Sequence, residues 1–162
     1  MSKPDLIAAL VRHGSMATQV EVDAFVEASD ELSDGTEPLD QGDVVALIGA
    51  LDAGDDHPEV RWTVLHVIEH QDAGPYLLGT LEALARNPGS EWAGLLVARL
   101  ANASSLWPAM AAVLATASSQ ERGRGIGPVR ALAEALDGSS DPKERERRET
   151  IRALADALDG RG

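Results

Sequence analysis

Several ingredients are missing from this chain of 162 residues or scarce in it, and each shortage excludes something. There is no cysteine, so disulfide bonds and thiolate-ligated metal sites are excluded. Aromatic residues make up only 3% of the sequence, so a core has to be built from Ala, Leu and Val. Ala and Leu favour helices, and windows rich in β-branched or aromatic residues are few. The composition therefore predicts an all-α protein.

Long apolar runs are also missing. The apolar stretch near the N-terminus, between Asp5 and Arg12, is too short for the hydrophobic region of a signal peptide, and no small-residue cleavage site follows it. Nothing approaches the roughly 20 apolar residues that a membrane span needs. We therefore expect a cytoplasmic protein with no membrane partner.

Basic residues are scarce in one half of the chain. The formal net charge is −13, but residues 1–82 hold 17 acidic and three basic residues, whereas residues 83–162 hold 10 and 11. Between Glu21 and Glu59 there are 13 acidic residues and no Lys or Arg. This asymmetry predicts one strongly negative side, which repels nucleic acid and anionic membranes and steers basic partners inward. Solubility alone is the competing explanation.

Apolar residues are present in quantity, at 44% of the chain, and they recur every three to four positions. The pattern predicts eight or nine helices joined by short turns, which favours antiparallel packing of neighbours. We expect a single helical domain, 1–162, with an acidic half, 1–82, and a near-neutral half, 83–162. Its helical hairpins would form either a HEAT-like stack or a compact bundle.

Local signals indicate where some helices begin. Asp56 precedes Pro58 and is expected to be the N-cap of one helix, while Ser90 and Asp141 are expected to cap two others. The glycine-rich run at 123–127 follows no strand and precedes no phosphate-binding motif, so a turn between helices is expected there.

One motif suggests an enzyme. His66, Glu69 and His70 match the H-x-x-E-H pattern of inverted zinc metallopeptidases, in which two imidazoles on one helix face bind zinc and the glutamate is the general base. Such enzymes need a third ligand and a much larger chain. A solvent-facing polar stripe explains the motif better, and no Ser-His-Asp arrangement can be assembled. We predict no enzyme activity, no metal and no cofactor.

Arg61 and the tryptophans carry structural predictions. On a helical wheel Arg61 falls inside the apolar arc, so its charge must reach solvent or find a carboxylate, and we expect it to fix its helix against neighbours. Trp62, Trp92 and Trp107 are expected to pack in the core or at its edge. An exposed tryptophan would instead indicate a binding anchor.

The stretch from Glu59 to Ala117 resembles the immunity protein 30 family of bacterial polymorphic toxin systems. The resemblance lies in E-V-R-W-x-V-L-H-V-I-E at 59–69, Y-L at 76–77 and E-W-A-x-L-L-V-x-R-L-x-N at 91–102. The positions here that we assign to the family motif are Arg61, Trp62, His66, Glu69, Trp92, Arg99 and Asn102. The resemblance implies that the protein neutralises a cognate toxin encoded beside it, and that the shared positions are structural.

Charge and resemblance lead to the same hypothesis. A nuclease-type toxin domain needs a basic surface to hold phosphates, and an acidic inhibitor competes for that surface. We therefore predict an immunity protein that binds a basic toxin and blocks it by occlusion. The expected contact residues are Asp43, Asp52, Asp55, Asp56 and Glu59.

Two other binding functions remain open. The first is a non-catalytic helical adaptor that presents the same acidic surface within a cytoplasmic assembly. The second is a nucleic-acid mimic that titrates a DNA-binding protein. A mimic needs carboxylates at regular spacing along one ridge, and the run from Glu21 to Glu59 does not obviously supply it.

Overall fold

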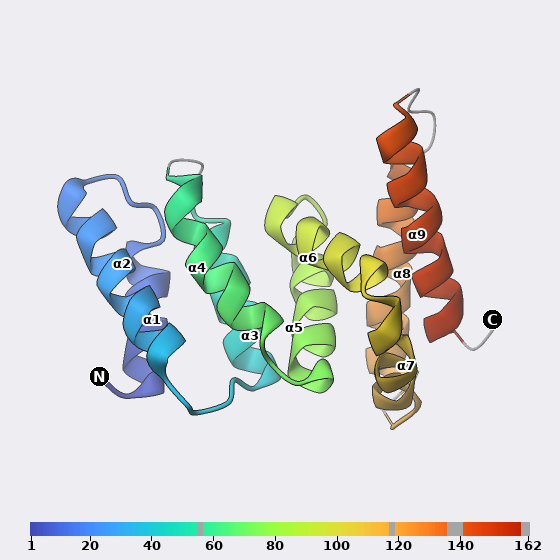
Figure 1. Cartoon of the computed structure of the whole chain (residues 1–162), viewed down its shortest axis with the longest axis horizontal. Helices are drawn as coiled ribbons and strands as arrows, with labels where there is room; N and C mark the ends of the chain where they lie inside the picture. Colours follow the sequence, from blue (N-terminus) through green and yellow to red (C-terminus); the bar gives the residue numbers. More distant parts are fainter. Residues whose placement is uncertain (55–56, 117–118, 136–140, 160–162) are drawn as a thin grey trace. The chain divides into compact units, whose positions relative to one another are not determined.

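The computed structural model describes residues 1–54, 57–116, 119–135 and 141–159, which form nine α-helices, one short 3-10 turn and no strand (Figure 1). The helices are α1 (Lys3–His13), α2 (Gln19–Asp34), α3 (Gln41–Leu51), α4 (Pro58–Glu69), α5 (Ala73–Arg86), α6 (Glu91–Asn102), α7 (Trp107–Thr116), α8 (Ser119–Ala135) and α9 (Pro142–Leu158), with the 3-10 turn at Ser104–Leu106. The predicted all-α fold with eight or nine helices is confirmed. Across these ranges, no helix is both long and apolar enough to cross a bilayer.

The helices group into two compact units, Met1–Gly79 and Thr80–Gly162, with α5 crossing the boundary between them. The boundary falls close to the change in charge between residues 82 and 83.

In the first unit two helical hairpins stack. α1 packs on α2 and on α3, and α4 packs on α2 and on α3. Figure 1 shows α1 and α3 running in one direction and α2 and α4 in the other. Each hairpin therefore places one helix in each of two layers, α1 beside α3 and α2 beside α4. This is a two-layer stack of helical hairpins.

Apolar side chains fill the space between the two layers. The largest of those that are under 2% exposed include Leu10, Phe25, Leu47, Leu51, Leu65 and Ile68. Burying each such side chain stabilises the fold by about 1.5–3 kcal/mol. Because these residues recur three or four apart, each helix turns one stripe inward and leaves its opposite face to solvent.

Reciprocal hydrogen bonds fix the starts of α2 and α3. Thr18 accepts from the backbone N–H of Glu21, whose carboxylate accepts from the backbone N–H of Thr18, and Asp40 and Asp43 repeat this capping box.

The start of α4 differs from the prediction. Its N-cap position is His57, which has a left-handed backbone at φ 56° and makes no side-chain capping bond. The N-cap predicted at Asp56 is therefore wrong by one residue, and Asp56 itself lies outside the described residues. Pro58, which was expected in the first turn, is the first residue of α4, where a proline is favoured.

In the second unit α9 packs on α6, α7 and α8. Ser90 accepts a hydrogen bond from the backbone N–H of Ala93, and Asp141 accepts one from Lys143, so both predicted N-caps are confirmed. Buried side chains from four helices meet around α9, among them Leu96, Met110, Val129, Ile151 and Leu154.

The glycine-rich run at 123–127 lies inside α8 and not in a turn, so that prediction is wrong. Each glycine lowers helix propensity by about 1 kcal/mol relative to alanine, and α8 also contains Pro128. The packing of α8 on α9 outweighs these preferences, because it buries Ile126 and Val129.

Candidate partner-binding surface

The formal charge of the chain is concentrated in one unit. Residues 1–79 contain 16 acidic and three basic residues, whereas residues 80–162 contain 11 of each. The whole net charge of −13 therefore belongs to the first unit.

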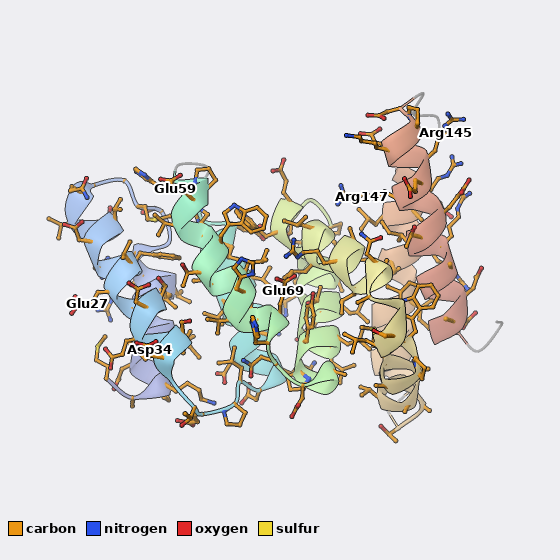
Figure 2. The ribbon with its side chains drawn as sticks, viewed as in Figure 1. Glu27, Asp34, Glu59, Glu69, Arg145 and Arg147 are labelled. Carbon is orange, nitrogen blue, oxygen red and sulfur yellow. The ribbon has the colours of Figure 1, made fainter. Side chains whose placement is uncertain are left out.

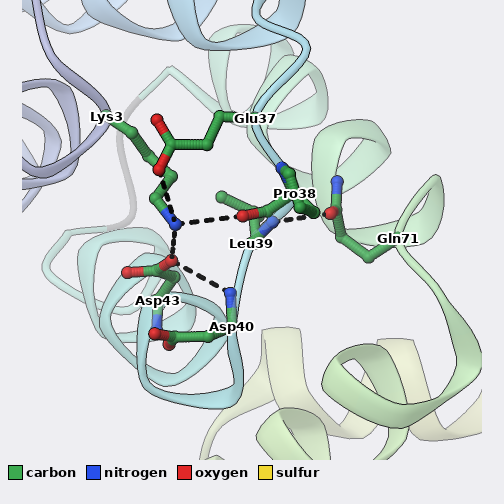
Figure 3. Close-up of polar contacts among 7 residues, drawn as sticks. All are labelled: Lys3, Glu37, Pro38, Leu39, Asp40, Asp43 and Gln71. Carbon is green, nitrogen blue, oxygen red and sulfur yellow. Dashed lines mark hydrogen bonds and ion pairs between the residues drawn. The ribbon is translucent and has the colours of Figure 1, made fainter.

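Two of the three basic residues of the first unit are engaged inside the fold. Arg61 is 1% exposed. Lys3 Nζ lies 2.8 Å from Asp43 Oδ2 and 3.5 Å from Glu37 Oε1, and donates to the carbonyl oxygen of Pro38 at 3.0 Å (Figure 3). The hydrogen bond to Asp43 raises the pKa of Lys3. Only Arg12, exposed in the last turn of α1, remains to offset the acidic surface.

The most regular acidic feature is a ridge on α2. Asp23, Glu27, Asp30 and Asp34 are all exposed and follow one another at intervals of four, three and four residues, which places them on one face of the helix. We call these four residues the α2 ridge. α2 contains no Lys or Arg. Glu31 lies next to the ridge and pairs with the amino group of Met1.

The α2 ridge destabilises its own helix. Carboxylates four residues apart repel one another, and the C-terminal end of a helix carries a partial negative charge that disfavours Asp30 and Asp34. Charges that oppose their own helix occur more often at functional sites than elsewhere on a protein surface.

Helix α4 lies beside α2 in the same layer and adds to this surface. Figure 2 shows Glu27 and Asp34 on α2, and Glu59 and Glu69 on α4. The Glu59 side chain is 70% exposed. Trp62 is 37% exposed, and its ring centroid lies 6.1 Å from that of His66. Trp62 is therefore not fully packed in the core.

The structure separates the predicted contact residues. Asp43 is at the third position of α3 and Asp52 follows its last residue, so about 13 Å of helix lies between them. Asp43 is also only 19% exposed, and it caps α3 and pairs with Lys3. Asp52 and Glu59 stand near the two ends of the α3–α4 connection. Asp55 and Asp56 lie outside the described residues.

Arg61 holds helix ends together. Its guanidinium donates to the carbonyl oxygens of Ala50 at 3.0 Å, Leu51 at 2.8 Å and Gly14 at 2.9 Å. The expectation that it fixes α4 against its neighbours is met by these bonds to backbone carbonyls, and its side chain does not reach solvent.

His66 and Glu69 form a pair on α4. His66 Nδ1 lies 3.0 Å from Glu69 Oε2, and His70 Nδ1 lies 2.7 Å from the carbonyl oxygen of His66. These contacts engage one nitrogen of each ring within the protein. Among the residues whose placement is described, no three His, Cys, Asp or Glu side chains are grouped to hold a metal ion.

A groove of about 540 Å³ opens at one end of the α2–α4 layer. Its walls come from the end of α2, the loop that follows it, and the end of α4 with the turn into α5. Among the lining residues are Ser33, Glu37, Leu39, His66, His70 and Asp72.

The α6 positions of the family motif lie in the second unit. Trp92 is half-buried and lines a separate groove with Leu132 and Arg147, while Arg99 is half-buried and Asn102 is exposed.

Comparison with known proteins finds no relative of this chain: no family model, no curated protein and no solved structure matches it. The resemblance to the immunity protein 30 family stays a prediction based on the short motifs at 59–69, 76–77 and 91–102.

Sequence reasoning missed the α2 ridge and the groove. The spacing of four, three and four residues from Asp23 to Asp34 is a helical signal that was available in the sequence. No sequence signal marks the groove, because it depends on how the loop after α2 folds back onto the end of α4.

Proposed function

We propose that this protein is an immunity protein that binds a basic protein toxin through the acidic surface of residues 1–79 and neutralises it by occlusion. The observation that carries the proposal is the α2 ridge, four exposed carboxylates on a helix without a single basic residue.

The charge distribution supports a protein partner and not a nucleic acid or an anionic membrane. Negative surfaces repel phosphates, and they attract basic proteins at rates that electrostatic steering raises by one or more orders of magnitude. A nuclease-type toxin domain fits this chemistry because it presents a basic surface to its own substrate. In this proposal the protein acts in the cytoplasm without a cofactor or metal, and it performs no catalysis.

Trp62 supplies the apolar element that such an interface needs. Interfaces concentrate their binding energy in a few aromatic and arginine anchors, and charged rims add speed and specificity. An exposed tryptophan on α4, beside the acidic layer, supports a protein interface over a surface that only confers solubility.

The test is to isolate the partner from the native host with the tagged full chain and to measure its affinity by calorimetry. A variant with Asp23→Asn, Glu27→Gln, Asp30→Asn and Asp34→Asn removes the ridge charge without changing side-chain size. The matched control, Glu144→Gln, Glu146→Gln and Glu149→Gln, removes charge from exposed positions of α9 in the second unit.

We expect a basic partner that harms cells when expressed alone, and an affinity that falls at least about a hundredfold in the ridge variant and stays unchanged in the control. A harmless housekeeping partner would instead favour the adaptor function. Equal binding by both variants would overturn the role of the ridge.

The nucleic-acid mimic is a second candidate, and the ridge favours it. Its carboxylates lie about 4.5–6 Å apart along the helix axis, which gives the regular spacing that a phosphate substitute requires. A DNA-binding protein that exchanges between the ridge and duplex DNA would support this candidate over a toxin.

A further inference from the structure

The groove at the end of the α2–α4 layer is bounded by two helix C-termini. Leu32 and Ser33 belong to the last turn of α2, and His66 and Val67 to the last turn of α4. The last carbonyl groups of a helix carry a partial negative charge. These two helix ends contribute negative potential to one groove, whereas the first turn of α5, which reaches the groove at Pro75, contributes positive potential.

The two histidines of the groove are fixed as hydrogen-bond acceptors when they are neutral. The partner of His66 Nδ1 is a carboxylate and that of His70 Nδ1 is a carbonyl oxygen, and both can only accept. Each Nδ1 therefore carries the hydrogen, which leaves Nε2 of each neutral ring as an acceptor.

Carboxylates complete the set of acceptors. Glu37 and Asp72 line the groove, and no Lys or Arg is among its lining residues in the described part of the chain, although Lys3 Nζ lies 3.5 Å from Glu37 Oε1. The Nε2 atoms and the two carboxylates favour a ligand that brings several donors and a positive charge. A guanidinium group meets this requirement, with five N–H donors and no acceptor.

Apolar side chains give the groove a place for an alkyl stem. Leu32, Pro38, Leu39, Val67 and Pro75 contribute to its lining. An arginine side chain buries its methylene groups against such surfaces while its charged end reaches polar partners.

The loop that forms one wall is held from both sides (Figure 3). Lys3 donates to the carbonyl oxygen of Pro38 at 3.0 Å, and the backbone N–H of Leu39 donates to Gln71 Oε1 at 2.9 Å. Gln71 is itself fixed, because its Nε2 donates to the carbonyl oxygen of Val67 at 2.9 Å. A wall that is already ordered loses little conformational entropy when a ligand binds.

We infer that this groove is a subsite for one arginine side chain of the partner. The inference rests on the proposed function for the class of partner, a basic protein, and adds the residue that the groove accepts. A partner steered by the α2 ridge arrives next to the groove, since Ser33 lines the groove and is adjacent in sequence to Asp34 of the ridge.

The experiment titrates the ¹⁵N-labelled full chain with N-acetyl-arginine methylamide, followed by ¹H–¹⁵N NMR. The citrulline analogue, which has the same shape without charge, and the lysine analogue are the matched probes. We expect saturable shifts at residues 35–39 and 66–72 with the arginine probe, and binding of both other probes at least about fivefold weaker.

Two variants locate the binding. His70→Lys places a cation in the groove and should abolish saturable binding, and Asp72→Asn should weaken it about three- to tenfold. Glu144→Gln, on α9, is the control and should leave it unchanged. Unchanged spectra outside residues 32–75 show that each variant is folded.

Equal binding of the citrulline or lysine analogue would overturn the assignment, and so would shifts that spread along α2 without saturating. These outcomes leave the proposed function standing, because it is tested by the ridge variant and the native partner. The opposite result is also possible: the arginine probe binds saturably in the groove, but the ridge variant binds the native partner as tightly as the parent does. That result would support the arginine subsite and overturn the proposed role of the ridge.

Discussion

The guanidinium of Arg61 donates a hydrogen bond of 2.9 Å to the carbonyl oxygen of Gly14, 47 residues earlier in the chain. Gly14 is the C-cap residue of α1, and the other acceptors of Arg61, Ala50 and Leu51, are the last two residues of α3. One buried cation therefore satisfies carbonyl groups at two helix C-termini, where the partial negative charge favours it. It ties α1, α3 and α4 into the unit that carries the acidic surface.

Arg61→Met should lower the free energy of unfolding by about 3–5 kcal/mol, because buried carbonyl oxygens lose a charged donor. Urea unfolding followed by circular dichroism measures the change. Arg86→Met is the matched control, since Arg86 is an exposed arginine paired with Glu82, and it should change stability by less than about 1 kcal/mol. Equal effects of the two substitutions would refute the capping role of Arg61.

Arg61 shows how much of this part of the structure could be predicted from the sequence. Its place in an apolar stripe predicted that its charge would reach solvent or find a carboxylate and that it would fix α4 against its neighbours, because the helical period fixes which residues face inward. The partners could not be predicted, since the carbonyl groups of Gly14, Ala50 and Leu51 meet only after two hairpins stack. Sequence periodicity reports the faces of helices but not which helix ends come together.

The acidic surface shows the same limit. Asp43 and Glu59 carry equal charge in the sequence, but Asp43 is committed to a capping box and to Lys3, whereas Glu59 is exposed. The capping box is local, but the pairing of Asp43 with Lys3 of α1, 40 residues earlier, depends on tertiary packing. Local signals were reliable where their physics is local, as at Ser90 and Asp141.

Two glycines in the first unit should respond in opposite ways to alanine. Gly49 is exposed on α3 and has no atom within 4 Å of the position where a Cβ would stand, so Gly49→Ala should stabilise the protein by about 0.5–1 kcal/mol. At Gly79 on α5 the new Cβ would lie 2.6 Å from Val44 Cβ and Cγ1, so Gly79→Ala should destabilise it by about 1–3 kcal/mol. Thermal unfolding of both variants tests the contact of α5 with α3. A stabilising Gly79→Ala would mean that the two helices do not approach this closely.

Because of Lys3, the free energy of unfolding should depend on pH in the alkaline range. Its pKa is raised above 10.5 by the hydrogen bond to Asp43, so the folded state holds this proton more tightly than the unfolded state. The stabilisation is fully present below pH 10.5 and is lost as pH rises through the higher pKa of the folded state. Lys3→Met should therefore lower the free energy of unfolding, by about 1 kcal/mol, at pH 7 to 9, and the difference from the parent protein should shrink above about pH 10.5.

The comparison of Lys3→Met with the parent protein is favourable because few side chains titrate at about pH 10: the chain has only two lysines and one tyrosine. Lys143→Met on α9, which removes the other lysine, is the matched control. A Lys3→Met difference that stays constant to pH 11.5 would contradict the ion pair with Asp43.

Neutralising the C-terminal part of the α2 ridge should stabilise the isolated protein. Asp30→Asn with Asp34→Asn relieves repulsion between the two carboxylates and with the end of the helix, for a gain of about 0.5–1.5 kcal/mol at low salt. The gain should fall in 1 M NaCl because these exposed charges are screened. Asp23→Asn, near the positive N-terminal end of α2, should give no gain. Destabilisation by the double variant would show that the ridge supports the fold and would remove this argument for a binding role.

Substitution of Trp62 distinguishes a binding anchor from a core residue. With 37% of it exposed, Trp62→Ala should lower the free energy of unfolding by no more than about 2 kcal/mol, less than the 3–5 kcal/mol typical of a buried tryptophan. If Trp62 is an anchor of the interface, the same substitution should weaken the native partner by at least about thirtyfold, mainly through faster dissociation. The ridge variant should act instead on association and on its dependence on salt, because long-range charge steers the encounter. Stopped-flow and surface plasmon resonance measurements on the two variants therefore test whether the α2 ridge acts on association and Trp62 on dissociation. If the Trp62→Ala protein binds the partner as tightly as the parent does, Trp62 is not an anchor of the interface. The acidic surface would then act only by electrostatic steering of the partner.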